Sequence, residues 1–383
     1  MSEPSSKPQD SNQQLTTPAS NSGQLNTLIA TLRPWLGLVL VCAGFSLNST
    51  FREKFWHLDY LGTLVQQATT NIILAVGMTL VILTGGIDLS VASVLALSGI
   101  ALGLTLKTGP PLFLALIMAI PIGVLSALMV VRFFRATLVS AGGVALVVTV
   151  GTGAIISIVT RGGIQLEGAI LAALAVGCGC GIINGLVVSL GKVPSFVVTL
   201  GMLTAARGLT VYATDGNSVS GLPSRMAILG DGSAAVVIAV IVVGLAGLLL
   251  NKTRAGRYLY AIGGNEEASR LTGVNIVVFK SLAYALSGLA AAVAAIVLTA
   301  KFKVADTGAA SGAELYAIAA VVIGGTRLSG GYGSVVGTLV GALMIAVLNA
   351  GLVLAGVRDT LQGVVIGGVI VLAVMLDQFR RRA

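Results

Sequence analysis

The chain has 383 residues, of which 56% are hydrophobic and only 10% are charged, and its mean hydropathy is +0.98. A soluble domain carries about a quarter charged residues, so this chain has too little charge to cover a water-facing surface of its size. The net charge of +9 is better explained by basic cytoplasmic loops of a membrane protein than by nucleic-acid binding, and we expect no nucleic-acid partner.

The composition changes sharply near the start of the chain. Residues 1–30 are rich in Ser, Gln, Asn and Pro without apolar periodicity, which predicts a disordered cytoplasmic tail rather than a secretory signal. Residues 31–383 then predict one all-α polytopic domain of about ten to twelve transmembrane helices surrounded by lipid. The apolar stretches are 34–51, 61–83, 89–106, 111–131, 136–160, 168–190, 194–214, 233–250, 277–300, 313–325, 333–354 and 361–376.

One of these stretches is too short to cross a bilayer. Residues 313–325 fall well below the length of about 20 residues that a transmembrane helix needs, so a half-helix or a broken helix is expected there. Interrupted helices are tolerated in membranes only where they are buried in protein or line a cavity. Placing both chain ends in the cytoplasm puts most of the 23 Lys and Arg residues on the inner side.

Two Gly-Gly breaks occupy corresponding places in the two halves of the chain. ILTGGIDLS at 82–90 resembles VIGGTRLS at 322–329, with an apolar helix, Gly-Gly and then Leu-Ser in each. Matching interrupted segments indicate two related halves and a transport pathway. The residues that we expect at a pathway or gate are Gly85, Gly86, Asp88, Ser90, Asn184, Gly324, Gly325 and Asn349.

Asp88 is open to two interpretations. An acid at membrane depth is costly, which favours a functional role such as ion coupling. The simpler role, which we prefer, is to cap a helix that starts at Leu89, with Ser90 close by. The apolar stretches hold no network of several acids or histidines, which argues against a proton-coupled carrier.

The longest polar connection deep in the chain is the 251–280 loop. Asn265 is placed to cap a short helix with acids in its first turn, and Gly273 is placed to end it. One face of this helix is apolar, which suits either a groove on a partner protein or lipid headgroups, and the residues alone leave both open. The candidate coupling residues are Gly263, Gly264, Asn265, Glu266, Glu267, Ala268, Arg270, Leu271 and Gly273.

The sequence carries no motif typical of nucleotide binding, metal binding or nucleophilic catalysis. It has no phosphate-binding loop, no metal-ligand spacing and no nucleophile elbow. We therefore expect no catalytic residue, no metal site and no bound cofactor, and if ATP drives the protein, another chain binds it.

Several long segments resemble one known family. Residues 75–83 running into GGIDLS, KVPSFVVTLGMLTAARGL at 192–209, TRAGRYLYAIGGNEEASRLTGVN at 253–275 and the run at 313–352 are similar to the ribose-type permeases of bacterial ABC importers. The resemblance covers most of 60–106 and 170–383, with the motifs in the family's order.

This resemblance implies a transport subunit rather than an enzyme. It would move a monosaccharide such as ribose or xylose across the bacterial inner membrane, with both termini cytoplasmic. Its partners would be a second permease copy or paralogue, two cytoplasmic subunits that bind ATP and Mg, and a periplasmic sugar-binding protein. The 264–273 helix would be the coupling helix that enters the ATPase. The alternative is an ion-coupled sugar carrier that uses Asp88.

The chain departs from the family pattern in one region. Compared with the family pattern, we expect about 60 extra residues within 107–170, which corresponds to two added spans. An even number of added spans leaves the downstream topology unchanged.

Overall fold

The computed structural model describes residues 35–47, 49–134, 138–159 and 165–382, and the expected 1–30 tail lies outside them. The described residues are almost entirely helical, with no strand beyond an isolated bridge between Val219 and Ala305. The helices run 35–46, α2 Ser49–Phe55, α3 Leu58–Leu83, α4 Val91–Lys107, α5 Leu112–Phe134, α6 Leu138–Val159, α7 Leu166–Gly191, α8 Ser195–Thr214, η1 Ser224–Met226, α9 Ala227–Gly230, α10 Gly232–Lys252, α11 Arg254–Gly264, α12 Glu266–Leu271, α13 Ile276–Phe302, α14 Ala313–Ile323, α15 Val335–Leu354 and α16 Asp359–Arg382.

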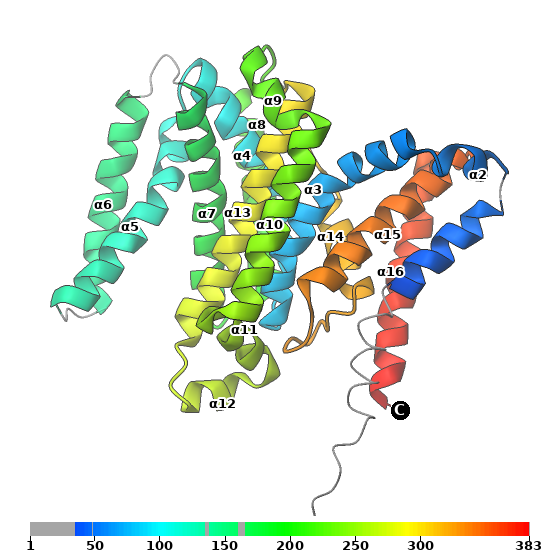
Figure 1. Cartoon of the computed structure of the whole chain (residues 1–383). Helices are drawn as coiled ribbons and strands as arrows, with labels where there is room; N and C mark the ends of the chain where they lie inside the picture. The colour runs from blue at the N-terminus through cyan, green and yellow to red at the C-terminus, as the bar shows by residue number, and fades with distance from the viewer. Residues whose placement is uncertain (1–34, 48, 135–137, 160–164, 383) are drawn as a thin grey trace, which may run out of the picture.

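The helices form an elongated bundle with a packed centre. Helices α3, α4, α7 and α13 make its core, and the α5–α6 pair extends from one edge (Figure 1). Helices α14, α15 and α16 lie at the opposite edge, while α11 and α12 lie together at one end of the bundle (Figure 1). The C-terminal end of α16 points to this same end.

The centre is packed through small residues. A side chain on Gly181 of α7 would overlap the backbone of α13 at Tyr284, and Gly177 and Gly288 approach one another in the same way. Without a hydrophobic driving force between helices in lipid, such close backbone packing is a main source of helix association. The high glycine content of the chain is therefore used where α7 crosses α13.

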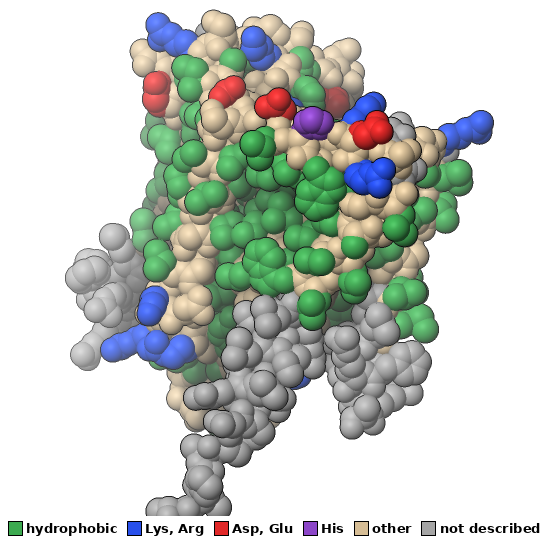
Figure 2. Space-filling view, turned by 45° about the vertical axis from the view of Figure 1, so that its right-hand side comes forward, with side chains coloured by type: hydrophobic (Ala, Val, Ile, Leu, Met, Phe, Trp, Pro, Cys, Tyr) green, Lys and Arg blue, Asp and Glu red, His purple; other side chains and the backbone are tan. Residues whose placement is uncertain are grey.

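The molecule has the surface of a membrane protein. Figure 2 shows hydrophobic side chains between an upper end with clustered charges and a lower end with Lys and Arg. In the described residues, six helices are long and apolar enough to cross a membrane, namely α3, α7, α8, α10, α13 and α15. The pair α4 and α5, bent by 110° at its break, would make a seventh. An all-α polytopic fold is thus confirmed.

The helices follow the predicted apolar stretches, with two differences in detail. Each of the twelve stretches coincides with a helix, and α14 has only 11 residues, as expected for a half-helix. The 251–280 loop, however, contains two helices instead of one, because α11 occupies Arg254–Gly264 before the predicted α12. Gly263 and Gly264 are therefore the last residues of α11, directly before the Asn265 cap of α12.

Candidate functional site

Both Gly-Gly breaks end a helix with the same turn. After α3, Gly85 N–H donates to Ile82 and Gly86 N–H donates to Val81, with N–O distances of 2.9 and 3.2 Å. After α14 the pattern is the same: Gly325 N–H donates to the Val322 carbonyl at 2.9 Å, and Thr326 N–H donates to the Val321 carbonyl at 3.1 Å. Gly85 and Gly325 both have positive φ, at 77° and 88°, which glycine adopts without strain.

The shared turn corrects the register of the sequence similarity. Gly85 corresponds to Gly325, and not to Gly324 as the aligned Gly-Gly pairs predicted, so the two Leu-Ser pairs fall one residue apart. Gly324 has a different role, because a side chain there would overlap the carbonyl oxygen of Gly337 where α14 and α15 cross.

The 84–90 segment after α3 is fixed to α8. Ile87 N–H donates to the Ser195 hydroxyl at 3.1 Å, and the Thr199 hydroxyl donates back to the Ile87 carbonyl at 3.2 Å. Ser195 and Thr199 are four residues apart and therefore share one face of α8. The backbone N–H and C=O groups of Ile87, which have no partner within a helix, are thus hydrogen-bonded to two side chains of α8.

Asp88 lies at the centre of a buried polar cluster. One carboxylate oxygen accepts from the Ser90 amide at 3.1 Å and from the Ser90 hydroxyl at 2.6 Å. The other accepts from the Ser287 hydroxyl of α13 at 2.9 Å, and Asn184 of α7 donates to the Ser90 hydroxyl at 2.9 Å. All four side chains are only 1% exposed.

This cluster extends the predicted role of Asp88. Helix α4 begins at Val91 rather than at Leu89, and the Asp88 carboxylate accepts the Ser90 amide two residues on, which is the bond expected of a helix cap. Asp88, Ser90 and Asn184 do come together, as a set of pathway residues would. They join the break to α7 and α13, however, and they line neither of two cavities, of about 810 and 500 Å³, that lie beside α3 and α14.

The predicted ends of α12 are confirmed. The Asn265 side chain accepts from the Ala268 amide at 2.9 Å, which is the N-cap bond expected from the sequence. At the other end Gly273 has φ of 84°, and Val274 N–H returns to the Ser269 carbonyl at 3.1 Å.

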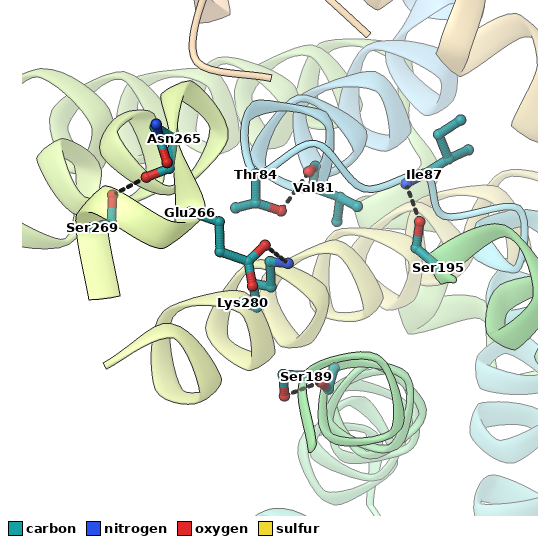
Figure 3. Close-up of polar contacts among 10 residues, drawn as sticks. Val81, Thr84, Ile87, Ser189, Ser195, Asn265, Glu266, Ser269 and Lys280 are labelled. Carbon is teal, nitrogen blue, oxygen red and sulfur yellow. Dashed lines mark hydrogen bonds and ion pairs between the residues drawn. The ribbon is translucent and has the colours of Figure 1, made fainter. Parts of the chain in front are cut away.

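The two acids of α12 are held by ion pairs. Glu266 binds Lys280 of α13 at 2.5 Å, and Glu267 binds Arg270 on its own helix at 2.6 Å. The Lys280 side chain is only 16% exposed, so the Glu266 pair fixes α12 against the start of α13 (Figure 3). The pair between Glu267 and Arg270 is exposed on both sides and contributes little to stability.

The apolar face of α12 has no cover within the described chain. Leu271 is 79% exposed, and Ala268 on the same face is exposed as well. Helix α12, which is capped and held by an ion pair, therefore presents the apolar Leu271 side chain without a contact partner in the described part of the chain.

A junction of glycines connects this helix to both breaks; we define it as Gly85, Gly263, Gly330 and Gly331. A side chain on Gly263 would overlap the Leu83 carbonyl oxygen at the end of α3 and the amide of Gly331. A side chain on Gly330 would lie 2.7 Å from the Gly85 nitrogen and 2.9 Å from the Gly263 Cα. The Gly331 amide donates to the Leu83 carbonyl at 3.0 Å.

Tyr260 adds a side-chain link to the glycine junction. Its hydroxyl donates to the Gly333 carbonyl at 2.8 Å, so α11 is bonded to the segment between α14 and α15. Movement of α11 and α12 would therefore act directly on the segments that follow α3 and α14. The coupling and pathway residues predicted separately meet at this point.

Not every predicted pathway residue lies here. Asn349 of α15 lines a cavity at the other end of the molecule, away from the glycine junction. The sequence reasoning missed Ser195, Thr199, Tyr260 and Ser287. The spacing of Ser195 and Thr199 was a usable signal, whereas nothing local marked Ser287 as a partner of Asp88. Among the described residues no group of His, Cys, Asp or Glu could hold a metal ion.

Comparisons with known proteins agree on one family. A family model described as the permease component of branched-chain amino acid transport systems matches residues 139–374. The ribose import permease of Escherichia coli is 36% identical over 358 residues, which cover 90% of this chain and 95% of the relative. That of Bacillus subtilis is 39% identical over 356 residues, covering 91% and 92%.

Permeases named for other sugars are also similar. The fructose import permease of Bifidobacterium longum is 34% identical over 342 residues, covering 84% of this chain and 79% of the relative. No solved structure matches the chain. The comparisons do not support the alternative of a secondary carrier.

The Asp88 cluster predicts how two substitutions will differ. In Asp88→Asn the amide oxygen can still accept from Ser90 and the amide nitrogen can donate to the Ser287 oxygen, so we expect a folded protein with near-normal stability and uptake. Asp88→Leu leaves the Ser90 and Ser287 groups buried without an acceptor and should cost about 1–3 kcal/mol. Thermal unfolding in detergent measures the difference. Loss of uptake in folded Asp88→Asn would contradict this structural role and would support ion coupling.

The glycine junction predicts different effects at two neighbouring positions. Gly263→Ala forces a methyl group into the Leu83 carbonyl, and such overpacking costs about 1–3 kcal/mol. Gly264→Ala meets nothing within 4 Å and should be tolerated. We expect protease cleavage in the 324–334 segment to accelerate in the first variant only. Equal cleavage rates in both variants would show that the junction is not a close contact.

Proposed function

The chain belongs to the family of import permeases that includes the ribose import permeases, and we propose that it is the membrane-spanning subunit of an ATP-driven importer for a monosaccharide. Ribose, xylose and similar monosaccharides such as fructose are the substrates that we favour, because permeases named for these sugars are among its relatives. The xylose permease of Haemophilus influenzae is 32% identical over 286 residues, which cover 57% of this chain and 76% of the relative. The chain is a transport component and not an enzyme.

The observation that carries this proposal is the exposed apolar face of α12 joined to both helix breaks. An ATPase that binds Leu271 would move α12, and the glycine junction would pass this movement to the ends of α3 and α14. A helix lying on lipid headgroups needs no such connection. The acids in its first turn also disfavour contact with an anionic membrane surface.

The proposed assembly contains several chains. Two copies of this permease, or one copy and a paralogue, would present two α12 helices to two ATP-binding subunits. A separate sugar-binding protein would deliver the substrate from the other side of the membrane. ATP and Mg would bind to the ATPase subunits, since the sequence of this chain has no phosphate-binding loop.

The proposed location is the bacterial inner membrane with both termini in the cytoplasm. The C-terminal end of α16 lies at the same end as α12 (Figure 1), which supports a shared cytoplasmic side. Five basic residues between Asn251 and Lys280 favour the cytoplasm for α11 and α12, with Arg327 on the same side.

The α5–α6 pair is proposed to be the two-span addition within about 107–170. Both helices lie at the edge of the bundle, where α5 packs against α7 and α6 packs mainly against α5 (Figure 1). A pair of antiparallel spans in this position leaves the downstream topology unchanged.

The docking role of α12 is tested by one substitution. Leu271→Asp places a charge where an apolar contact with the ATPase is expected, and loss of a buried leucine contact costs about 2 kcal/mol or more. We expect co-purification with the candidate ATPase subunits from the same bacterium to fall by at least about tenfold.

The matched control is Leu58→Asp, at the start of α3. Leu58 is similarly exposed, at 85%, but lies at the opposite end of the molecule from α12 (Figure 1). It should retain the ATPase. Equal retention by both variants would contradict docking through α12, and absence of any ATPase in the wild-type preparation would contradict the proposed function.

A further inference from the structure

Two cavities lie side by side at the end of the bundle away from α12. One, of about 810 Å³, is bounded by α3, α4, α13, α14 and the segment between α13 and α14. The other, of about 500 Å³, is bounded by α3, α14 and α15. They share Gln67, Asn71 and Tyr316 in their linings, so these three side chains form the wall between them. Their volumes are in the range of small-molecule sites.

The floor of these cavities is closed. Every residue of α3 from Ile72 to Leu83 is buried, directly below Asn71. The hydroxyls of Thr79 and Thr338 meet at 2.7 Å and join α3 to α15 within this closed part. The cavities therefore end above the glycine junction, on the side from which an imported substrate would arrive.

The shared wall is polar and neutral. Gln67 and Asn71 contribute amides, Tyr316 contributes an aromatic ring with a hydroxyl, and Asn349 adds a third amide in the smaller cavity. The Asn71 Oδ1 atom is buried and has no hydrogen-bond partner in the described part of the chain. A buried acceptor without a partner is costly, so a hydrogen-bond donor supplied by a ligand would be favourable at this position.

We propose that Gln67, Asn71 and Tyr316 form a binding site in which a monosaccharide is held during passage through the permease. The proposal rests on the proposed function and extends it, because it places the substrate on one set of side chains. Sugar hydroxyls can donate to Asn71 Oδ1 and bond to the Gln67 amide, while the Tyr316 ring covers an apolar face of the sugar.

Charged groups lie toward the rim and not in the shared wall. Lys301 and Asp306 line only the larger cavity. Asp306 already accepts from the Ser218 hydroxyl at 3.0 Å and from the Gly308 amide at 3.2 Å. A free amino acid would need a charged partner for each of its two ends, so the neutral wall favours a sugar.

The chain supplies a matched control beside the site. Gln66 neighbours Gln67 on α3 but turns the other way, and its side chain packs against Gly232 at the start of α10. Gln66 lines neither cavity. A contribution to binding from Gln67 and not from Gln66 would therefore separate a cavity role from a general effect on α3.

The test is ligand-dependent thermal stabilisation of the purified full-length chain in lipid nanodiscs. D-ribose, D-xylose, D-fructose and L-leucine are each added up to about 100 mM, since a ligand that binds the folded protein stabilises it by RT ln(1 + L/Kd), where L is the free ligand concentration, and so raises the melting temperature. We expect one or more of the sugars to stabilise the wild type and Gln66→Ala. In Gln67→Ala and Asn71→Leu the sugar concentration needed for the same rise in melting temperature should increase by at least about tenfold.

Two outcomes would overturn the site. One is no stabilisation of the wild type by any sugar, with or without stabilisation by leucine, and the other is equal stabilisation of all four proteins by the sugars. Folding of each variant is checked by its elution as a single species and by retention of the ATPase subunit. If the wild type retains the ATPase subunit but no sugar stabilises it, the proposed site is wrong and the proposed function stands. If the wild type does not retain the ATPase subunit, the proposed function is wrong.

Discussion

The close backbone contact at the glycine junction is the constraint on which the rest of this structure depends. Gly263, at the end of α11, touches both the end of α3 and the segment after α14, and no side chain fits between them. Because these contacts join backbone to backbone, they transmit displacement without the slack of flexible side chains. The exposed Leu271 at one side of the junction and the two helix breaks at the other can thus behave as one mechanical unit.

Polar bonds around the breaks give this unit a defined shape. The 84–90 segment is fixed to α8 through Ser195 and Thr199 and to α13 through Asp88 and Ser287. The closed floor below Asn71 separates the two cavities from the end of the molecule that carries α12. In the proposed cycle a movement of α12 would reach the ends of α3 and α14, and through them the floor on which the substrate rests.

The sequence predicted local features well and distant contacts poorly. Apolar length located the helices, and Asn265 and Gly273 marked the ends of α12 because capping depends on nearby residues. The bond between Asp88 and Ser287 joins residues 199 positions apart, and no local pattern identifies it. Likewise, composition could not show that Gln67 faces a cavity while Gln66 faces α10, or that Gly263 meets Leu83. Such features appear only when the helices are placed together.

The most direct measurement of the central claim is sugar uptake by proteoliposomes that contain this chain with its candidate ATPase and sugar-binding protein. Labelled ribose, xylose and fructose are supplied outside, and ATP is trapped with the ATPase inside. The account predicts accumulation of at least one sugar that requires both ATP and the binding protein. Accumulation driven by a proton or sodium gradient without ATP would contradict it.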